Sequence, residues 1–456
     1  MSIGTQNGDL QRWMLLPARS YDAINEAASG PLIQRQAWRW RAWWIAFLAA
    51  GVLTVMMIAG IVWPFFRGVG VWGNNTTVVW GFPLANYEWW IGIGNAGLLI
   101  SAILVLTRQP AAAAIQRIAE SMALLSACVA GLFPILHLGR PQYAYWLIPY
   151  PNTMMVWPQW RSALIWDFWS ILSFILFTAI YFYVGLIPDL ATLRDRASNI
   201  VARLFYGVLA MGWRGSARHW RIHSAYRMTM AGLAVPLVVV AHSVVGLDFA
   251  ASLMPGWQET IFPTYYVIGA LVLGSATLLI VMAVARWGLR LSDLITPDHF
   301  NLVAKFLLAA SIGMGLCYCT EYFAAWYHGE RAERWLVAYE FTGAYAPMYW
   351  TMLLFIVVLP QALWFEPLRR NIAAVLAIAV LADIGMWIER IIIIWLTLSH
   401  GYIVSMWRLF IPTAWDWALL IGSFGFFLLM FLLLARVLPL LAMDSLKRLL
   451  TDEAPR

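Results

Sequence analysis

Charged residues are scarce in this chain, and their scarcity is the first guide to its class. Asp, Glu, Lys and Arg make up only 12% of the 456 residues, whereas hydrophobic residues make up 62% and the mean hydropathy is +0.72. A soluble protein carries about twice this share of charge. The composition therefore excludes soluble and disordered proteins and indicates an integral membrane protein.

Cysteine is scarce as well. Cys128, Cys317 and Cys319 are the three cysteines of the chain, and they lie within apolar segments. They form no zinc or haem-attachment pattern and no disulfide framework. Cys317 and Cys319 are two positions apart on an expected helix, so their side chains should point in different directions. We expect all three to be structural.

Long apolar runs are abundant. Each run is long enough for a helix to cross a bilayer, which takes about 20 residues. Ten such runs predict an all-α protein with ten spans, at residues 43–65, 89–106, 119–137, 162–186, 228–247, 264–286, 302–326, 347–365, 372–397 and 415–438. About 40 residues precede the first run, which is itself too long for a signal peptide. We expect the first span to be retained.

Basic residues predict the orientation of these spans. Most of the 30 Lys and Arg residues fall in segments on the side of the two termini. Arg390 lies within a span, and six others fall on the opposite side: Arg67, Arg140, Arg161, Arg331, Arg334 and Arg408. The positive-inside rule then places both termini in the cytoplasm. The longest inside connection, 187–227, contains a basic amphipathic stretch that is typical of a membrane surface or a partner contact.

Ionisable residues inside the predicted spans concentrate in the outer half of the membrane, and the inner half holds few. Because such groups are costly to bury in a bilayer, they indicate function. The outer-half set comprises His137, Asp167, His242, Asp248, Glu321, Asp383, Glu389 and Arg390.

The connection between His137 and Asp167 contains four prolines and several aromatic residues. This proline density excludes a continuous helix and favours a stiff loop. A histidine and a buried carboxylate can accept the two protons that a quinol loses on oxidation. Tyr143, Tyr145 and Trp146 could surround the quinol ring. The pattern predicts a quinol site, with His137 and Asp167 as its catalytic pair.

Several of these residues also have structural explanations. His137 could cap its helix, and Glu321 and Asp383 fit a proton path and a buried hydrogen bond equally well. Glu389 and Arg390 could form an ion pair, but adjacent positions on a helix do not face each other, so we expect them to have different partners.

Two further patterns are set aside. His137 and His242 could hold a haem, but the spans lack the second histidine pair of a transmembrane electron chain. The GxGxxG pattern at Gly92, Gly94 and Gly97 follows no strand, and it predicts close helix packing instead of a nucleotide site.

Longer motifs carry a resemblance to a known family. Within residues 80 to 400 these are HLGRPQYAYWLIPYPN, WPQWRSALIWDF, GLIPDLATLRDR, HSVVGLDFAASLMPGWQETIFPTYYVIGA, EYFAAWY and DIGMWIER. They resemble segments of the NrfD/PsrC-like family, the membrane subunits of polysulfide reductase and its relatives. The resemblance is greatest to the ActC branch, found in bacterial alternative complex III.

The resemblance implies two four-helix bundles, spans 2–5 and 6–9, flanked by one helix at each end. The implied units are a cytoplasmic segment 1–42, a flanking helix 43–65, an N-terminal bundle 89–247 with the quinol site, a C-terminal bundle 264–397, a flanking helix 415–438 and a cytoplasmic tail 439–456.

The resemblance also implies a function and a set of binding residues. The chain would bind and oxidise quinol, menaquinol being favoured over ubiquinol, and would hold no haem or metal itself. The matching positions imply that His137 and Asp167 form the quinol site and that His242, Asp248, Asp383 and Arg390 fit a proton path. Together with the residues named from the sequence itself, the predicted quinol-binding set is His137, Asp167, Arg140, Tyr143, Tyr145, Trp146 and Asn95. The predicted proton path is His242, Asp248, Glu321, Asp383, Glu389 and Arg390. Relatives carry a histidine where this chain has Asn95, and an amide cannot titrate.

The implied partners are an extrinsic iron–sulfur subunit on the outer face, multihaem cytochrome c subunits and a paralogous NrfD-like membrane subunit. The implied location is the bacterial inner membrane. Two other functions stay open: a proton-conducting module, which needs a polar path through the inner half, and a passive anchor for redox subunits, which leaves Asp167 and Arg390 unexplained.

Overall fold

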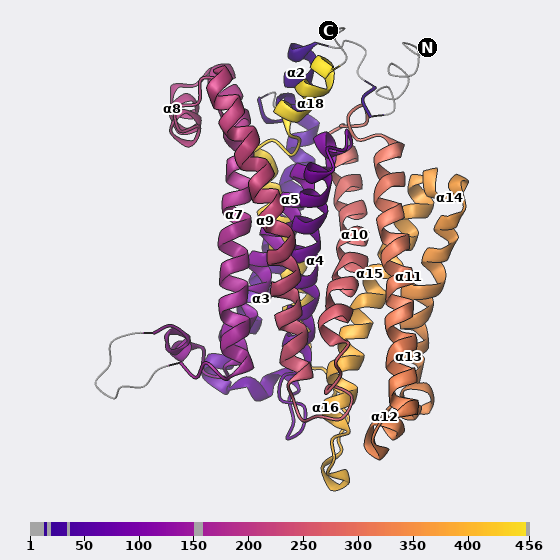
Figure 1. Ribbon diagram of the computed structural model, residues 1–456. Coiled ribbons are helices and arrows are strands. Elements are labelled where there is room, and N and C mark those ends of the chain that lie inside the picture. The colour runs from indigo at the N-terminus through magenta and orange to yellow at the C-terminus, as the bar shows by residue number, and fades with distance from the viewer. Residues whose placement is uncertain (1–12, 16–19, 34–36, 150–157, 453–456) are drawn as a thin grey trace.

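The computed structural model describes residues 13–15, 20–33, 37–149 and 158–452. Every regular element within these ranges is helical. Ten of the helices, or runs of consecutive helices, are long and apolar enough to cross a membrane, which confirms the ten predicted spans. Figure 1 shows these spans side by side, with α2 and α18 at one end of the molecule and α12 and α16 at the other; we call these the α18 end and the α12 end.

The spans run in alternating directions along the chain, and short elements connect them. The spanning elements are α3 (Ala37–Arg67), α4 (Gly81–Leu106), α5 (Ala112–Ala130), α7 (Ala163–Arg196), α9 (Ala217–Ala250), α10 (Phe262–Gly288), α11 (Pro297–Tyr327), α13 (Ala346–Leu353) with η3 (Leu354–Val358) and η4 (Leu359–Trp364), α15 (Ile372–Ile391) with η5 (Ile392–Leu396) and α16 (Thr397–Ser399), and α17 (Ala414–Val437). The connecting and terminal elements are α2 (Tyr21–Ile33), η1 (Val69–Trp72), α6 (Phe133–His137), η2 (Pro141–Leu147), α8 (Ile200–Leu209), α12 (Arg331–Thr342), α14 (Glu366–Arg370), η6 (Val404–Met406) and α18 (Met443–Asp452).

Helix α4 lies at the centre of the molecule. It packs against α5, α9, α10 and α15, and 83% of its most apolar stretch is buried. Helices α5, α7 and α9 lie on one side of it, while α10, α11, α13 and α15 pack against one another on the other side. The first and last spans, α3 and α17, are far apart in the sequence but pack against each other. Side chains on α4 can therefore face either group of helices.

Several helices extend well beyond the predicted spans. Helix α4 begins at Gly81 instead of residue 89, and α5 begins at Ala112 instead of residue 119. At the α18 end, α7 continues to Arg196 instead of residue 186, and α9 begins at Ala217 instead of residue 228. The predicted boundaries followed hydropathy alone, and the polar ends of these helices are held by protein contacts instead of lipid.

The glycines of α4 allow its neighbours to approach closely. A Cβ atom added at Gly97 would lie 2.8 Å from the backbone oxygen of Ala119 on α5, closer than van der Waals contact permits. The expectation that the GxGxxG pattern serves helix packing is confirmed. Cys317 is buried and Cys319 is exposed, as expected for side chains that point in different directions. The structural role of the cysteines stays a prediction.

We expect Gly97→Ala to destabilise the protein by about 1–3 kcal/mol, because the added methyl group forces α4 and α5 apart. Thermal unfolding in detergent measures this effect. Gly232→Ala on α9 is the matched control, because a Cβ at Gly232 meets no atom within 4 Å and alanine favours the helix by about 1 kcal/mol. Equal melting temperatures for the two variants would contradict the expected clash.

Candidate functional site

A buried tyrosine–carboxylate pair lies toward the α12 end. Asp167, on the first turns of α7, is only 6% exposed and accepts a short hydrogen bond from the Tyr87 hydroxyl on α4. Tyr87 is 1% exposed. The sequence analysis named Asp167 but missed Tyr87, because its predicted span began two residues later. The polar pair of tyrosine and glutamate directly before the tryptophans of α4 was the available signal.

Two more carboxyl groups lie near this pair. Glu88, the residue after Tyr87, is 1% exposed, and its Oε2 has no hydrogen-bond partner among the described residues. It lies within electrostatic range of Asp167 and Arg390. Asp248 on α9 lies within range of both Asp167 and Glu88. The structure thus brings the predicted Asp167, Asp248 and Arg390 into one region and adds Glu88 to them.

An apolar cavity of about 250 Å³ opens beside this region, between η1, the start of α4 and the segment around α6. Trp72, Trp80, Leu136 and Leu138 are among its walls. Pro83 also lines it, and Tyr87 follows Pro83 by four residues on α4. Residues four apart lie on one helix face, about 6 Å apart along the axis. The cavity-lining Pro83 and Tyr87 therefore lie one helical turn apart on α4.

His137 is the last residue of α6, between the cavity-lining Leu136 and Leu138. Its side chain lies outside the described part of the chain, so its pairing with Asp167 stays a prediction. Residues 150–157 of the connection between His137 and Asp167 also lie outside the described residues.

The three aromatic residues predicted to surround the quinol ring lie together in the structure. Tyr143, Tyr145 and Trp146 lie on η2, where Tyr145 and Trp146 are about half exposed. The Tyr143 and Trp146 rings stack with centroids 4.8 Å apart. Arg140, directly before η2, is exposed. The structure presents these residues as an aromatic surface patch, and their part in quinol binding stays a prediction.

Asn95 lies deeper, two turns along α4 from Tyr87. Its Nδ2 atom donates to the Ile91 oxygen at 3.0 Å and contacts Nδ1 of His242 at 3.2 Å. Since Nδ2 is a donor, His242 Nδ1 accepts, and its ring proton is on Nε2. Both residues are buried, His242 completely. The amide of Asn95 therefore orients His242 on α9, whereas its predicted role as a quinol ligand is not tested.

Glu389 and Arg390 contradict one expectation. They are adjacent on α15, yet Arg390 Nε lies 3.2 Å from Glu389 Oε2 and both side chains are 1% exposed. This ion pair contradicts the prediction that they have only different partners, although each also has a neighbour of its own: Tyr265 for Glu389 and Tyr266 for Arg390. The Arg390 guanidinium also lies 4.2 Å from the centroid of the Tyr266 ring. A π-helical turn, η5, begins two residues later, and such turns are frequent at functional sites.

Asp383 lies nearer the membrane centre on α15. The Thr277 hydroxyl on α10 lies 3.2 Å from each of its carboxylate oxygens. Trp89 of α4 donates to its backbone oxygen at 3.3 Å. Asp383 therefore joins α4, α10 and α15.

A second group of carboxyls lies at the α12 end around Glu321, which is half-buried. It lies within electrostatic range of Glu340 and Glu333. Burial raises the pKa of Glu340 to about 8. Burial and a hydrogen bond with Glu333 raise the pKa of Glu259 to about 8. Burial thus favours the protonated form of both Glu259 and Glu340, and the sequence analysis named neither.

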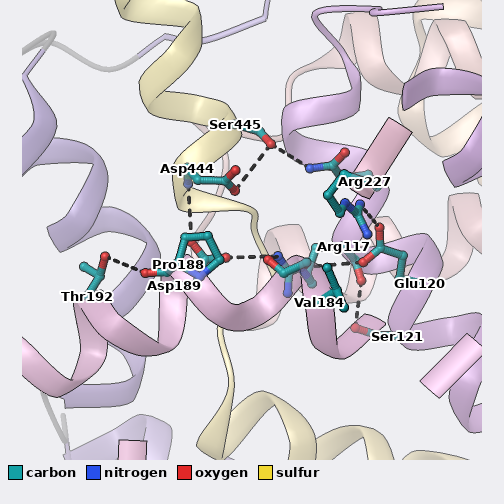
Figure 2. Close-up of polar contacts among 12 residues, drawn as sticks. Arg117, Glu120, Ser121, Val184, Pro188, Asp189, Thr192, Arg227, Asp444 and Ser445 are labelled. Carbon is teal, nitrogen blue, oxygen red and sulfur yellow. Dashed lines mark hydrogen bonds and ion pairs between the residues drawn. The ribbon is translucent and has the colours of Figure 1, made fainter. Parts of the chain in front are cut away.

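An ion cluster near the α18 end overturns the expectation that the inner half holds few ionisable groups. Arg227 Nη2 lies 2.6 Å from Glu120 Oε1, and Arg117 Nη2 lies 3.0 Å from Asp189 Oδ2. Arg117, Glu120 and Asp189 are at most 1% exposed. Figure 2 shows the four side chains together, from α5, α7 and α9. We call these four residues the inner ion cluster.

The reason for this error is the placement of span boundaries. The predicted spans began after Arg117 and Arg227 and ended before Asp189, so these residues were assigned to loops. Pro188 shows how the longer α7 helps build the cluster. Because proline has no N–H, it leaves the Val184 oxygen without its helical partner, and His223 Nε2 donates to that oxygen at 3.0 Å. Glu120 fell inside the predicted third span, so a carboxylate within an apolar run was a signal for the cluster, together with the charges at the helix ends.

Helix α18 closes the inner ion cluster. The backbone N–H of Asp444 donates to Asp189 Oδ1 at 3.3 Å, and Gln116 Nε2 donates to the Ser445 hydroxyl at 2.8 Å. Contacts with α5 and α7 hold α18 against these spans. Buried polar groups thus occur toward both ends of the N-terminal helices, at the Tyr87–Asp167 pair and at the inner ion cluster.

Comparison with known proteins gives the family. The model of the polysulphide reductase NrfD family matches residues 70–404. The chain is 24% identical, in an alignment 354 residues long that covers 75% of each chain, to a putative membrane subunit of dimethyl sulfoxide reductase from Halobacterium salinarum. It is 22% identical over 268 residues to a selenate reductase subunit from Mesobacillus selenatarsenatis, covering 56% of this chain and 61% of that protein. The resemblance to the family is confirmed, while the ActC branch stays a prediction. With most of its length matched, this multi-pass membrane protein belongs to the polysulphide reductase NrfD family.

Proposed function

We propose that this chain is the quinol-oxidising membrane subunit of a respiratory or photosynthetic oxidoreductase complex. The observation that carries the proposal is the buried Asp167, which accepts a hydrogen bond from Tyr87; Tyr87 in turn lies one helical turn along α4 from the cavity-lining Pro83. A carboxylate at that depth must be paired, protonated or hydrated. A quinol ring beside it supplies a proton to accept, and an apolar cavity suits the ring itself.

The relatives support the same assignment. Both are named as subunits of reductases, one for dimethyl sulfoxide and one for selenate. A reductase needs an electron donor, and a lipid-soluble quinol is a donor that reaches a membrane-embedded protein through the bilayer. The passive-anchor alternative gives no reason for the buried Asp167 and Arg390.

In the proposed reaction, quinol is converted to quinone with release of two protons and two electrons. Asp167 accepts one proton, and the Tyr87 hydrogen bond fixes the carboxylate that receives it. His137 accepts the second, and both protons leave at the α12 end. An iron–sulfur cluster of a partner protein would accept the two electrons, one at a time. Glu88 and Asp248, near Asp167, form the first part of the exit route for protons.

The complex we propose places an iron–sulfur subunit against the α12 end, which is the outer face under the positive-inside rule. Both termini then lie in the cytoplasm of a bacterial cell. The alternative complex III type, with multihaem cytochromes c and a paralogous membrane subunit, and menaquinol as the substrate follow from the ActC resemblance. Purification of the native complex and identification of its subunits tests this part.

Proton translocation is a second candidate, favoured by the inner ion cluster. Glu120 and Asp189 place carboxylates near the α18 end, while His242 and Asp383 lie buried between that end and Asp167. Proton uptake from the cytoplasmic side during turnover in sealed vesicles would support translocation, and release on the outer side alone would exclude it.

We expect Trp80→Leu to raise the KM for quinol several-fold and to change kcat little, because Trp80 lines the cavity but reaches no proton of the substrate. Quinol-dependent reduction of an artificial acceptor by the purified complex measures both constants. Trp146→Leu on η2 is the comparison. An increase in KM for Trp146→Leu alone would place the ring under the aromatic patch of η2 instead of in the cavity.

A further inference from the structure

Two basic cavities adjoin each other at the α18 end, far from the proposed quinol site. The first has a volume of about 670 Å³ and lies between α7, α9 and α18. The second, of about 580 Å³, lies between α4, α5, α9 and α18. They share Ser224, Asp444 and Arg448 as walls. Neither takes part in the quinol reaction proposed above.

The first cavity has an excess of positive charge. Its cationic walls are Arg194, Arg214, Arg221, Lys447 and Arg448.

The three carboxylates of the first cavity are already engaged. Asp189 pairs with Arg117, Asp195 with Arg194 at 2.8 Å, and Asp444 with Arg448 at 3.6 Å.

Two of the arginines are available to an anion. The side chains of Arg214 and Arg221 are exposed, and neither forms an ion pair with a carboxylate of the described residues. Burial lowers the pKa of the neighbouring Lys447, so an added negative charge would favour its charged form. The cavity therefore suits a phosphate or another compact anion, which arginine binds through paired N–H groups.

Helix α8 favours a lipid as the source of this anion. The helix adjoins the first cavity in the chain, and Leu204 and Val208 on it are 63% and 78% exposed. Two hydrogen bonds hold α8 in place. Tyr183 of α7 donates to the Leu209 oxygen at 2.7 Å, and Tyr206 of α8 donates to the oxygen of Val437, the last residue of α17. A short helix fixed at the end of the spans with apolar side chains facing outward is typical of the headgroup region of a bilayer.

The walls of the cavity suit the same region. Trp213 and Trp220 line it, and tryptophan is enriched at membrane–water interfaces. Their rings lie edge to face, with centroids 4.9 Å apart. Under the positive-inside rule this end faces the cytoplasmic leaflet, which holds anionic lipids.

We propose that the cavity lined by Arg214, Arg221 and Trp213 binds the phosphate headgroup of an anionic phospholipid, whose acyl chains lie along the exposed apolar side chains of α8. The lipid would fix α8 to α9 and α18. Basic pockets between membrane helices bind anionic headgroups in this way.

The test is lipid binding to the purified complex that contains the full chain, with phosphatidylglycerol as the probe in phosphatidylcholine nanodiscs and native mass spectrometry as the readout. The double variant Arg214→Gln/Arg221→Gln should bind phosphatidylglycerol roughly 30-fold more weakly, at about fivefold for each arginine. Both side chains are exposed, so the fold should be retained, and thermal unfolding checks this.

Arg218→Gln is the matched control, because Arg218 is an exposed arginine on α9, the helix of Arg221, but does not line the cavity. It should change binding less than threefold. Equal binding by the double variant and the wild type would overturn the proposal. Displacement of phosphatidylglycerol by millimolar inorganic phosphate would overturn the lipid assignment and indicate a soluble anion, and equal retention of phosphatidylcholine would overturn the charge-based argument.

Discussion

Asp167→Asn should lower quinol-dependent electron transfer by roughly 10²- to 10⁴-fold, the range typical of a lost general base. Asparagine keeps the shape of the side chain and can still accept the Tyr87 hydrogen bond through its oxygen, but it cannot take a proton from quinol. The complex should therefore assemble normally. The measurement is quinol-dependent turnover by the purified complex, with the same set of subunits verified in the wild type and the variant.

Tyr87→Phe tests how much the positioning of Asp167 contributes. It removes the hydrogen bond to Asp167 and keeps the carboxylate, so turnover should fall less than in Asp167→Asn and the apparent pKa of the reaction should shift. Full turnover by assembled Asp167→Asn would place quinol oxidation elsewhere in the complex. This chain would then be a proton path or an anchor.

Glu120→Gln should destabilise the protein by about 3–5 kcal/mol, the largest stability effect we expect. Glu120 is fully buried and pairs with Arg227 at 2.6 Å. Its removal leaves the inner ion cluster with two arginines and one carboxylate, and an unbalanced charge away from water is strongly unfavourable. The melting temperature in detergent and the yield of folded protein measure the effect.

Glu366→Gln is the control, because Glu366 also pairs with an arginine, at 2.8 Å from Arg370, but is 60% exposed. It should change stability by less than about 1 kcal/mol. The double variant Glu120→Gln/Arg227→Met removes both charges of the pair and should recover part of the loss. A Glu120→Gln variant as stable as Glu366→Gln would show that water reaches the cluster.

Much of the fold follows from the order of residues alone. A bilayer requires apolar runs of fixed length, so the ten spans can be counted in the sequence, and all ten are present. The glycine pattern of α4 likewise predicted close packing, which the contact at Gly97 confirms. Span ends were predicted less well, because hydropathy reports contact with lipid and not contact with other helices.

The candidate site could be predicted only in part. Asp167 stood out because a single carboxylate inside an apolar run needs an explanation. Tyr87 did not, because a tyrosine before a span is ordinary until its hydroxyl is seen to face a carboxylate 80 residues away. The pairing of Asn95 with His242 joins α4 to α9 and leaves no trace in either segment.

Composition and run length are local properties, so the order of residues was enough to establish a helical membrane protein with ionisable groups near one face, and its longer motifs carried the resemblance to the NrfD family. Which of those groups meet depends on the tertiary structure. Arg117, Glu120, Asp189 and Arg227 come from three helices. All but Glu120 fell outside the predicted spans, where a single charge near a membrane surface is ordinary. Burial converts them into the inner ion cluster, because a charge excluded from water must find its partner in another part of the chain.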